Sequence, residues 1–374
     1  MRLALTEEQE MLRKTARDFL AEKCPMKFVK QMEESDTGYS TDLWQEMAEL
    51  GWMGLAFPEK YGGGDMSFLD LAVLLEEMGR ACLPGPFFST VVLGGLPILD
   101  IGSEEQKQEY LPGLIRGEKI LTLALNEPGY HNYDASSIKL EATPDDGNYI
   151  IKGTKLFVPD AHIADYLLWV ARTKPEKGIT IFLTDAKSPK IKYTILKSIA
   201  GDKLCEVVFD QMPVLKANIL GQLGQAESAV RKIIDRAAVG KCCEMVGNIQ
   251  RVLEMTIDYA KERKQFDRPI GSFQVIQHYC ADMSTDVDGV RLSTYQAAWM
   301  LSEGLPCTKE VAIAKAWAGE ASQRVIALAH QIHGAIGVTM EHDLHFYTRR
   351  AKAGELAFGD ANFYREIVAR EMGL

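Results

Sequence analysis

One long stretch with helical periodicity constrains the fold of this chain more than any other feature. Between residues 226 and 262, apolar side chains recur at helical spacing and form one wide face. They are Val230, Ile233, Ile234, Ala237, Val246, Ile249, Val252, Leu253 and Ile257. A helix of about ten turns with so broad an apolar face is typical of a bundle, where neighbouring helices cover it. We therefore expect a bundle in the C-terminal part of the chain.

Proline and glycine divide the rest of that part into further helices. Residues 269–271, Pro-Ile-Gly, end the long helix, and a second helix is expected over about 273–301. A third is expected over about 308–333, because a glycine follows it where a helix C-terminus favours one. A last helix is expected after Phe363. The prediction is a four-helix-bundle domain over residues 226–374.

The remaining chain has two different textures. Residues 1–120 show helical spacing, and the capping-box patterns Thr6 to Gln9 and Ser103 to Gln106 predict two helix N-termini. From 121 to 225 short β-rich runs appear instead, for example residues 149–151, 166–170 and 179–183. Asp-Asp-Gly-Asn at 145–148 reads as a hairpin turn. The predicted fold class is therefore α+β and multidomain, with an N-terminal α-helical domain, a small β-barrel-like domain and the bundle.

Composition narrows the classes of partner and compartment. The chain has 374 residues, which is enough for two or three domains, and its net charge of −10 argues against nucleic acid and anionic membranes as partners. No apolar run reaches the length of about 18 residues that a membrane span needs. Its seven cysteines form no C-x-x-C pattern, which favours a reducing, cytoplasmic compartment. Cys242 and Cys243 lie among apolar neighbours and are expected to be buried thiols.

Two kinds of site are not expected from the sequence. No P-loop is present, and no Gly-x-Gly-x-x-Gly follows a strand, so a Rossmann domain is excluded as the holder of a dinucleotide. His330 and His333, and likewise His342 and His345, have the i, i+3 spacing of some metal sites. Neither pair has a third ligand at a conventional spacing, so we expect no metal.

Six motifs in a fixed order carry a family resemblance. They are Pro-Glu-Lys-Tyr-Gly-Gly at 58–63, Leu-Glu-Glu-Met-Gly-Arg at 75–80, Asn-Glu-Pro-Gly at 126–129, Ile-Lys-Gly-Thr-Lys at 151–155, the run from Glu262 to Met283, and Gln-Ile-His-Gly-Ala-Ile-Gly at 331–337. Together they resemble the acyl-CoA dehydrogenase family over the whole chain. The resemblance implies FAD as cofactor and an acyl-CoA thioester as substrate. It also implies an electron-transferring flavoprotein as acceptor and an oligomer, usually a tetramer.

The resemblance also implies which residues hold the cofactor. The expected FAD contacts are Leu125, Glu127, Phe157, Arg263, Gln265, Phe266, Gln274, Gln331, Ile332, His333, Gly334, Ala335, Asp360 and Asn362. Arg263 suits a charge-assisted contact to the pyrophosphate. In the family, the residues that match Arg263, Gln265, Phe266 and Gln274, and those of the 331–335 run, reach the FAD of a neighbouring subunit. Asp235 and Arg236 fall where family members hold the acyl-CoA.

Several residues depart from the family pattern around the expected reaction centre. The commonest catalytic base of the family is a Glu followed by Gly-Thr, and this chain has Phe358-Gly359-Asp360 there. An alternative position for that Glu is Ala237. Pro159 replaces the Thr that bonds the flavin N5, and proline has neither a hydroxyl nor an N–H. The loop over residues 126–134 is one residue longer and bulkier than usual.

Three hypotheses about function follow from these departures. The first is an FAD-dependent dehydrogenase with a relocated carboxylate, for which Asp360 is the nearest candidate, on a cyclic, branched or otherwise unusual acyl group. The second is a base-lacking subunit of a heteromeric dehydrogenase, whose paralogous partner supplies the Glu. The third is a family relative with another flavin-dependent reaction or a non-catalytic role. The sequence does not identify the acyl group, whose pocket depends on residues 83–95.

Overall fold

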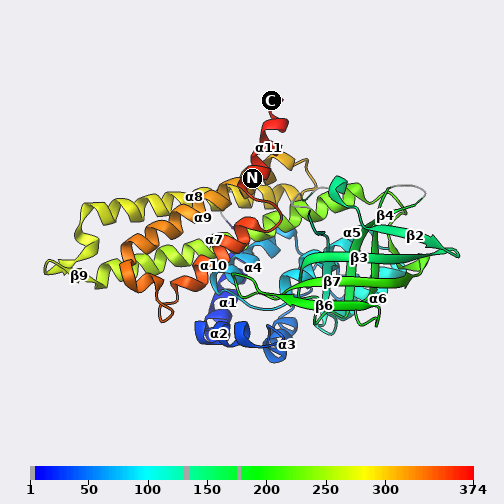
Figure 1. Ribbon diagram of the computed structural model, residues 1–374. Helices are drawn as coiled ribbons and strands as arrows, with labels where there is room; N and C mark the ends of the chain where they lie inside the picture. The colour runs from blue at the N-terminus through cyan, green and yellow to red at the C-terminus, as the bar shows by residue number, and fades with distance from the viewer. Residues whose placement is uncertain (1–4, 130–132, 134, 175–177) are drawn as a thin grey trace. The chain divides into compact units, whose positions relative to one another are not determined.

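The computed structural model describes residues 5–129, 133, 135–174 and 178–374 (Figure 1). Part of the lengthened loop, namely Tyr130 to Asn132 and Asp134, therefore lies outside the described residues. By internal contacts the chain divides into two compact units. Unit 1 comprises residues 1–30, 68–83 and 238–374, and unit 2 comprises 31–67 and 84–237.

Unit 1 is helical. Its helices include α1 (Glu7–Lys23), α4 (Phe68–Arg80), most of α7 (Glu227–Glu262), α8 (Gln274–Ser302), α9 (Thr308–His333), α10 (Leu344–Leu356) and α11 (Ala361–Glu371). Helix α9 packs against α8, α10 and α11, and α4 packs against α1 and α8. Figure 1 shows α8 and α9 running side by side. The bounds of α7, α8 and α9 agree with the expected bundle helices, whereas α10 was not predicted.

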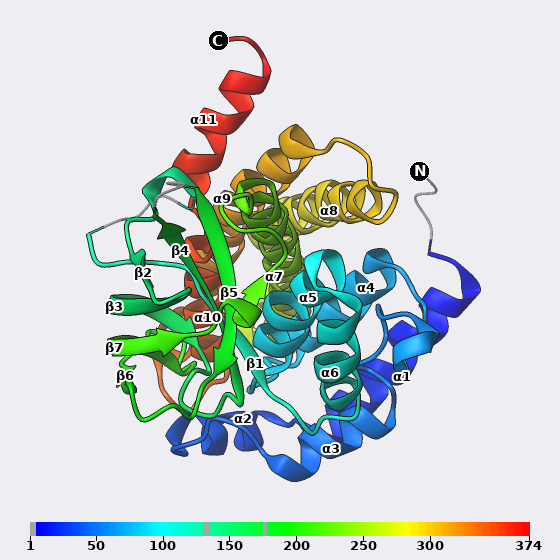
Figure 2. The ribbon, with the colours of Figure 1, turned by 90° about the vertical axis from the view of Figure 1, so that its right-hand side faces the viewer.

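Unit 2 contains a sheet of eight strands among the residues that are described. They are β1 (Leu121–Ala124), β2 (Glu141–Asp145), β3 (Asn148–Pro159), β4 (Tyr166–Thr173), β5 (Ile179–Asp185), β6 (Ile191–Leu196), β7 (Leu204–Val214) and β8 (Ile219–Leu220). The order is β6-β7-β3-β2-β4-β5-β8, and β1 pairs in parallel with β4. Figure 2 shows β2, β3, β7 and β6 as neighbours. The predicted hairpin turn is present, since Asp146 and Gly147 link β2 to β3 with φ of 43° and 79°.

The expected helix starts are also present. The hydroxyl of Thr6 accepts from the Gln9 amide at 3.2 Å, and the Gln9 side chain accepts from the Thr6 amide at 3.1 Å. Ser103 and Gln106 form the same reciprocal pair at the start of α6 (Glu104–Ile115) in unit 2. Both predicted capping boxes are thus confirmed.

A buried π-helix in unit 2 occupies most of the segment expected to shape the acyl pocket. It spans Phe88–Gly95, with all eight residues buried, and leads into α5 (Leu96–Ile101). Gly94 permits this packing, because a Cβ there would lie 2.5 Å from the Cβ of Leu121 on β1. A π-helix is rare and often marks a functional site. Unit 2 also contains α3 (Thr41–Glu49), while α2 (Met26–Glu34) lies at the division between the units.

Two glycines bring α4 and α7 into close contact inside unit 1. A Cβ on Gly79 would lie 2.0 Å from the carbonyl oxygen of Glu244, and one on Gly247 would lie 1.8 Å from that of Glu76. Only glycine permits such an approach of two helix backbones. Gly79 of the motif at 75–80 is therefore explained by packing rather than by chemistry.

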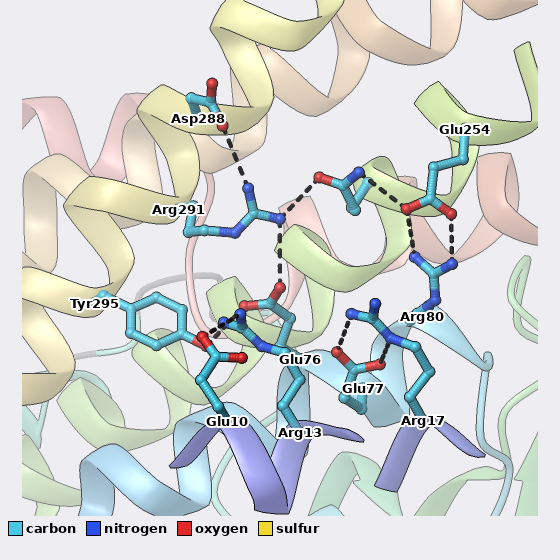
Figure 3. Close-up of polar contacts among 11 residues, drawn as sticks. Glu10, Arg13, Arg17, Glu76, Glu77, Arg80, Glu254, Asp288, Arg291 and Tyr295 are labelled. Carbon is cyan, nitrogen blue, oxygen red and sulfur yellow. Dashed lines mark hydrogen bonds and ion pairs between the residues drawn. The ribbon is translucent and has the colours of Figure 1, made fainter. Parts of the chain in front are cut away.

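The acidic residues of the same motif form a buried ionic network (Figure 3). Arg17 of α1 donates two hydrogen bonds to Glu77, at 2.9 and 2.7 Å. The Glu76 carboxylate accepts from the Tyr295 hydroxyl at 2.7 Å and from Arg291 at 3.3 Å. Figure 3 shows these partners on α1 and α8, and it also draws Glu254 of α7, which pairs with Arg80 of α4. The motif at 75–80 thus joins the helices of unit 1.

The cysteines agree with the expectation from the sequence. All seven cysteines are free thiols, and Cys242 and Cys243 are buried as predicted. Burial raises the pKa of Cys242 to about 12, so its thiol stays protonated. Of the described helices, none combines the length and apolar character that a membrane span requires.

Candidate flavin and acyl-CoA site

A strained hairpin presents the first group of expected FAD contacts. Directly after α7, β9 (Lys264–Gln265) and β10 (Arg268–Pro269) pair across a two-residue turn. The turn residues Phe266 and Asp267 have φ of 52° and 60°, and the Phe266 side chain is 86% exposed. A bulky residue in this backbone region costs about 1–3 kcal/mol, and such strain gathers at binding sites. The hairpin therefore exposes the flat Phe266 ring to solvent, where a ligand can contact it.

The polar side chains around this ring are available for binding. Arg263, Gln265 and Gln274 are exposed and make no side-chain hydrogen bond or ion pair with any residue that the structure describes. A guanidinium, two amides and an aromatic ring match the pyrophosphate and the adenosine of FAD. The residues present thus fit the cofactor by their donor chemistry.

The end of α9 brings the second expected FAD motif to the same region. The His333 ring stacks on Tyr259 of α7 with centroids 4.5 Å apart, and the Tyr259 hydroxyl donates to the His333 carbonyl at 3.4 Å. Tyr259 precedes Arg263 by one helical turn, and the Arg263 amide donates to the Tyr259 carbonyl at 2.8 Å. The motif at 331–335 therefore lies beside the start of the hairpin within unit 1.

The five residues expected from that motif divide by exposure. Gln331, Gly334 and Ala335 are exposed, whereas Ile332 and His333 are buried. The His333 Nδ1 donates to the Ala329 carbonyl at 2.8 Å, which orients the ring inward. Burial lowers the pKa of His333, so the ring is neutral at physiological pH. The side chains of Ile332 and His333 support the turn, and the exposed three residues remain the candidates for direct contact.

In unit 2, a β-bulge places the aromatic residue expected to cover the flavin. The β3–β7 register shifts between Lys155 and Val158, and the bulged Phe157 has φ of 55° with its ring 52% exposed. Bulges re-aim side chains beside functional sites. Next to it, the Pro159 carbonyl accepts from the Thr122 hydroxyl at 2.6 Å. The Thr122 hydroxyl therefore already donates its hydrogen bond within the protein. Pro159 has no donor for the flavin N5.

A buried ion pair joins Glu127 to β3 beside this bulge. Lys155 is fully buried, and its Nζ donates to the Glu127 carboxylate at 2.6 Å and to the Leu125 carbonyl at 3.1 Å. The same carboxylate accepts from the amides of Lys139 and Leu140, at 2.9 and 3.1 Å. Burial lowers the pKa of Lys155 to about 8, against the raising effect of Glu127. The Glu127 side chain, an expected FAD contact, is therefore occupied in shaping the loop.

Lys155 is a residue whose role sequence reasoning missed. It lies in the quoted motif at 151–155, and its position between buried Ile151 and buried Val158 on one strand was the available signal. A lysine on the apolar side of a strand needs a buried partner, because an unpaired buried charge is very costly. That partner is Glu127, the acidic residue of the motif at 126–129.

The turn with the missing base lies between α10 and α11. Phe358 and Gly359 have φ of 57° and 107°, and the Tyr364 hydroxyl donates to the Phe358 carbonyl at 2.8 Å. Asp360 is the N-cap of α11, where its Oδ1 accepts from the Phe363 amide at 2.8 Å. Asn362 is exposed and accepts from Arg365 at 3.2 Å. The turn thus presents one carboxylate with a second oxygen that the cap bond does not use.

The two residues expected to hold acyl-CoA differ in their surroundings. Arg236 pairs with Asp100, which also binds Lys232 at 2.8 Å, so this guanidinium is already neutralised within unit 2. Asp235 makes no hydrogen bond or ion pair to any described residue. Burial raises its pKa from 3.8 to about 6, while Arg231 opposes the rise. Burial therefore disfavours the charged form of Asp235, and a carboxylate in such an environment is typical of functional sites.

Asp235→Asn is expected to stabilise the protein by about 2 kcal/mol at pH 7.5, and by much less near pH 4. The folded pKa lies above the unfolded one, so the folded state binds more protons between the two values. Stability is therefore lost as the pH rises through this window, and asparagine removes that loss. Urea unfolding at both pH values measures the difference. Asp258→Asn, an exposed carboxylate on the same helix, is the control and should change little at either pH.

Three of the four histidines considered for metal binding make other contacts. The His330 Nε2 and the Thr348 hydroxyl are hydrogen-bonded at 2.8 Å, and the rings of His333 and His342 meet edge to face at 4.9 Å. Within the described residues, no group of three His, Cys, Asp or Glu side chains could hold a metal ion.

Comparison with known families matches the chain over nearly its whole length. The acyl-CoA dehydrogenase N-terminal domain matches residues 6–118, the middle domain 122–212 and the C-terminal domain 220–373. Among solved structures, the ChsE4–ChsE5 complex from Mycobacterium tuberculosis is 29% identical with a TM-score of 0.92, covering 100% of this chain and 99% of that one. The expected fold class is thus confirmed.

Curated relatives agree with these matches. An acyl-CoA dehydrogenase of Bacillus subtilis is 32% identical and covers 98% of each chain. CarC, a subunit of the caffeyl-CoA reductase–Etf complex of Acetobacterium woodii, is 30% identical and covers 97% of this chain and 98% of its own. The chain therefore belongs to the acyl-CoA dehydrogenase family, whose members are FAD-dependent oxidoreductases that act on the CH–CH bond of an acyl-CoA.

Proposed function

We propose that this chain binds FAD and catalyses the α,β-dehydrogenation of an acyl-CoA thioester, with an electron-transferring flavoprotein as electron acceptor. The observation that carries the proposal is the hairpin after α7, where the strained Phe266 is exposed beside Arg263 and Gln265. The side chains of Arg263 and Gln265 have no hydrogen-bond or ion-pair partner among the described residues. A chain without such a ligand would have no reason to retain this strain. The relation to a subunit of a reductase–Etf complex supports the acceptor.

Within this proposal the chain's residues have separate tasks. FAD, when bound, supplies the acceptor for the β-hydride. Phe157 would cover the flavin ring, and the Lys155–Glu127 pair would hold the neighbouring loop in place. Asp360 would take the α-proton, because it is the carboxylate nearest in sequence to the usual position of the base. Asp235 would contact the acyl-CoA.

A second candidate is the base-lacking subunit of a heteromeric dehydrogenase. Two observations favour it: Phe358 and Ala237 occupy both usual positions of the base, and one oxygen of Asp360 is committed to the α11 cap. The solved ChsE4–ChsE5 complex, which pairs two named chains, is a relative with this kind of assembly. In this case a paralogous partner would supply the glutamate.

The site implies an oligomer under either candidate. Helix α9 contacts the Phe358 turn through Lys315 and lies beside the β9–β10 hairpin at His333. These two residues are separated by 18 positions, or roughly 27 Å of helix. Two FAD-binding regions so far apart on one helix suit two different FAD molecules, one of them shared with a neighbouring subunit. We propose a homotetramer or a heterotetramer with a paralogue. The free cysteines agree with the cytoplasm as its compartment.

Loss of FAD from the Arg263→Met variant tests the cofactor site. Removing a charge-assisted contact to a pyrophosphate should weaken FAD binding by about 10- to 100-fold, which corresponds to 1.5–3 kcal/mol. The ratio of flavin to protein absorbance after gel filtration, followed by titration with FAD, measures it. Lys261→Met removes an exposed charge two residues earlier, on α7, and should keep wild-type affinity. Equal affinity in all three proteins would rule out the hairpin as an FAD site.

A further inference from the structure

Lys315 is a fully buried lysine of unit 1 to which the proposed reaction assigns no role. It lies on α9, and its Nζ donates to the carbonyls of Glu355 at 2.8 Å and of Gly359 at 2.7 Å. The Nζ also lies 5.8 Å from the centroid of the Tyr364 ring. All these partners flank the Phe358 turn. One side chain of a neighbouring helix thus contacts this turn from both ends.

The two carbonyls need a donor for different reasons. Helix α10 ends at Leu356, so the Glu355 carbonyl is among the last four of the helix, which have no partner inside it. The Gly359 carbonyl lies beyond the helix end, in the turn itself. An ammonium has three N–H donors and can serve both at once. Lys315 therefore closes the end of α10 and ties the following turn to α9.

The turn needs such restraint because its backbone is strained. Phe358 has φ of 57°, a conformation that bulky residues rarely adopt, and Gly359 has φ of 107°. A Cβ on Gly359 would lie 2.6 Å from the Phe363 ring, so glycine is required there. The surrounding bonds hold the strain: the Tyr364 hydroxyl donates to the Phe358 carbonyl, and the Asp360 carboxylate caps α11. Lys315 adds a charged donor to the Glu355 and Gly359 carbonyls.

The buried charge is itself costly. Burial lowers the pKa of Lys315 to about 8, although the nearby Glu355 and Asp360 carboxylates raise it again. An apolar side chain of similar length would fill the same space without desolvation of an ammonium. The lysine at this position is therefore best explained by the hydrogen bonds that its ammonium donates to the Glu355 and Gly359 carbonyls.

We propose that Lys315 is a positioning residue, which fixes the turn of residues 357–360 so that Asp360 and Phe358 face the reaction centre in one defined conformation. The consequence for catalysis rests on the proposed function. The consequence for the turn does not, and the two are measured separately.

Amide hydrogen exchange of the full FAD-loaded protein tests the effect on the turn. In Lys315→Met, amides of residues 357–364 should exchange about 10- to 100-fold faster, as expected for losing hydrogen bonds from a charged donor. Amides of β4 and β5 should keep their wild-type rates. Lys352→Met is the matched control, because Lys352 bonds the same Glu355, but through its side chain at 2.8 Å and from an exposed position. Unchanged exchange in the turn, or equally faster exchange everywhere, would overturn the proposal.

Flavin reduction tests the effect on catalysis. A positioning role predicts that Lys315→Met slows reduction at saturating acyl-CoA by at least about tenfold, with a nearly unchanged half-saturating concentration. If the wild-type protein reduces no flavin, the proposed function fails and the exchange data alone decide the role of Lys315. If Lys315→Met does not fold, Tyr364→Phe replaces it, since it removes only the hydroxyl that bonds Phe358. If the turn amides of Tyr364→Phe exchange at the wild-type rate, the hydrogen bonds described here do not hold the turn, and the proposal is contradicted.

Discussion

Asp360→Asn is expected to slow reduction of the bound flavin by acyl-CoA by about 10²- to 10⁴-fold, the contribution of a general base. The structure makes this substitution unusually clean. The Asp360 Oδ1 caps α11 through the Phe363 amide, and asparagine caps helices as well as aspartate does. The variant should therefore lose the proton acceptor and keep the helix. Stopped-flow absorbance under anaerobic conditions measures the rate.

The control for this variant is Asp282→Asn, which removes an exposed carboxylate on α8 and should reduce flavin at the wild-type rate. Thermal unfolding of both variants checks that the cap is intact. If Asp360→Asn keeps the full rate, Asp360 is not the base. A partner-supplied glutamate would then be favoured, and reduction should depend on a co-purified paralogue.

Arg17→Met is expected to lower the free energy of unfolding by about 3 kcal/mol, near the lower end of the range for breaking a buried ion pair. The Glu77 carboxylate is 1% exposed and receives both of its described hydrogen bonds from Arg17. Without them it would be a buried charge with no donor. Partial exposure of the Arg17 side chain limits the loss, since water can enter. Urea unfolding measures it.

Replacing both partners should be milder than replacing one. In Arg17→Met/Glu77→Met no charge is left without its partner, so the loss should fall to about 1 kcal/mol or less. Lys14→Met, which removes an exposed ion pair with Asp18 on the same helix, should cost under about 0.5 kcal/mol. A double variant as unstable as Arg17→Met would show that packing, rather than the unpaired charge, determines the effect.

The parts of the fold that were predictable depend on local rules. The apolar face around Val246 predicted α7, and the pairs Thr6–Gln9 and Ser103–Gln106 predicted helix starts that the structure contains. Both signals act within a few residues, so they are visible in the sequence. Helix α10 was missed because its apolar side chains are covered by segments that are distant in sequence, α9 among them. The π-helix at Phe88–Gly95 was missed because its burial depends on distant segments.

The candidate site was predictable as a set of positions, but not as a set of roles. The sequence placed Glu127 and His333 among cofactor contacts, and the structure shows their side chains engaged with Lys155 and Ala329. Exposure separates the residues that can reach a ligand from those that support them, and exposure is a tertiary property. The contribution of Lys315 was invisible for the same reason, because its acceptors are backbone carbonyls 40 and 44 residues away.

A flavin enzyme that acts on acyl-CoA should transfer electrons from its substrate to its own flavin. To measure this, the purified, FAD-loaded chain is mixed anaerobically with a panel of straight, branched and cyclic acyl-CoA thioesters, and the flavin absorbance is followed. At least one thioester should bleach the flavin with no other protein present. A flavin that stays oxidised with every thioester would contradict a self-sufficient dehydrogenase.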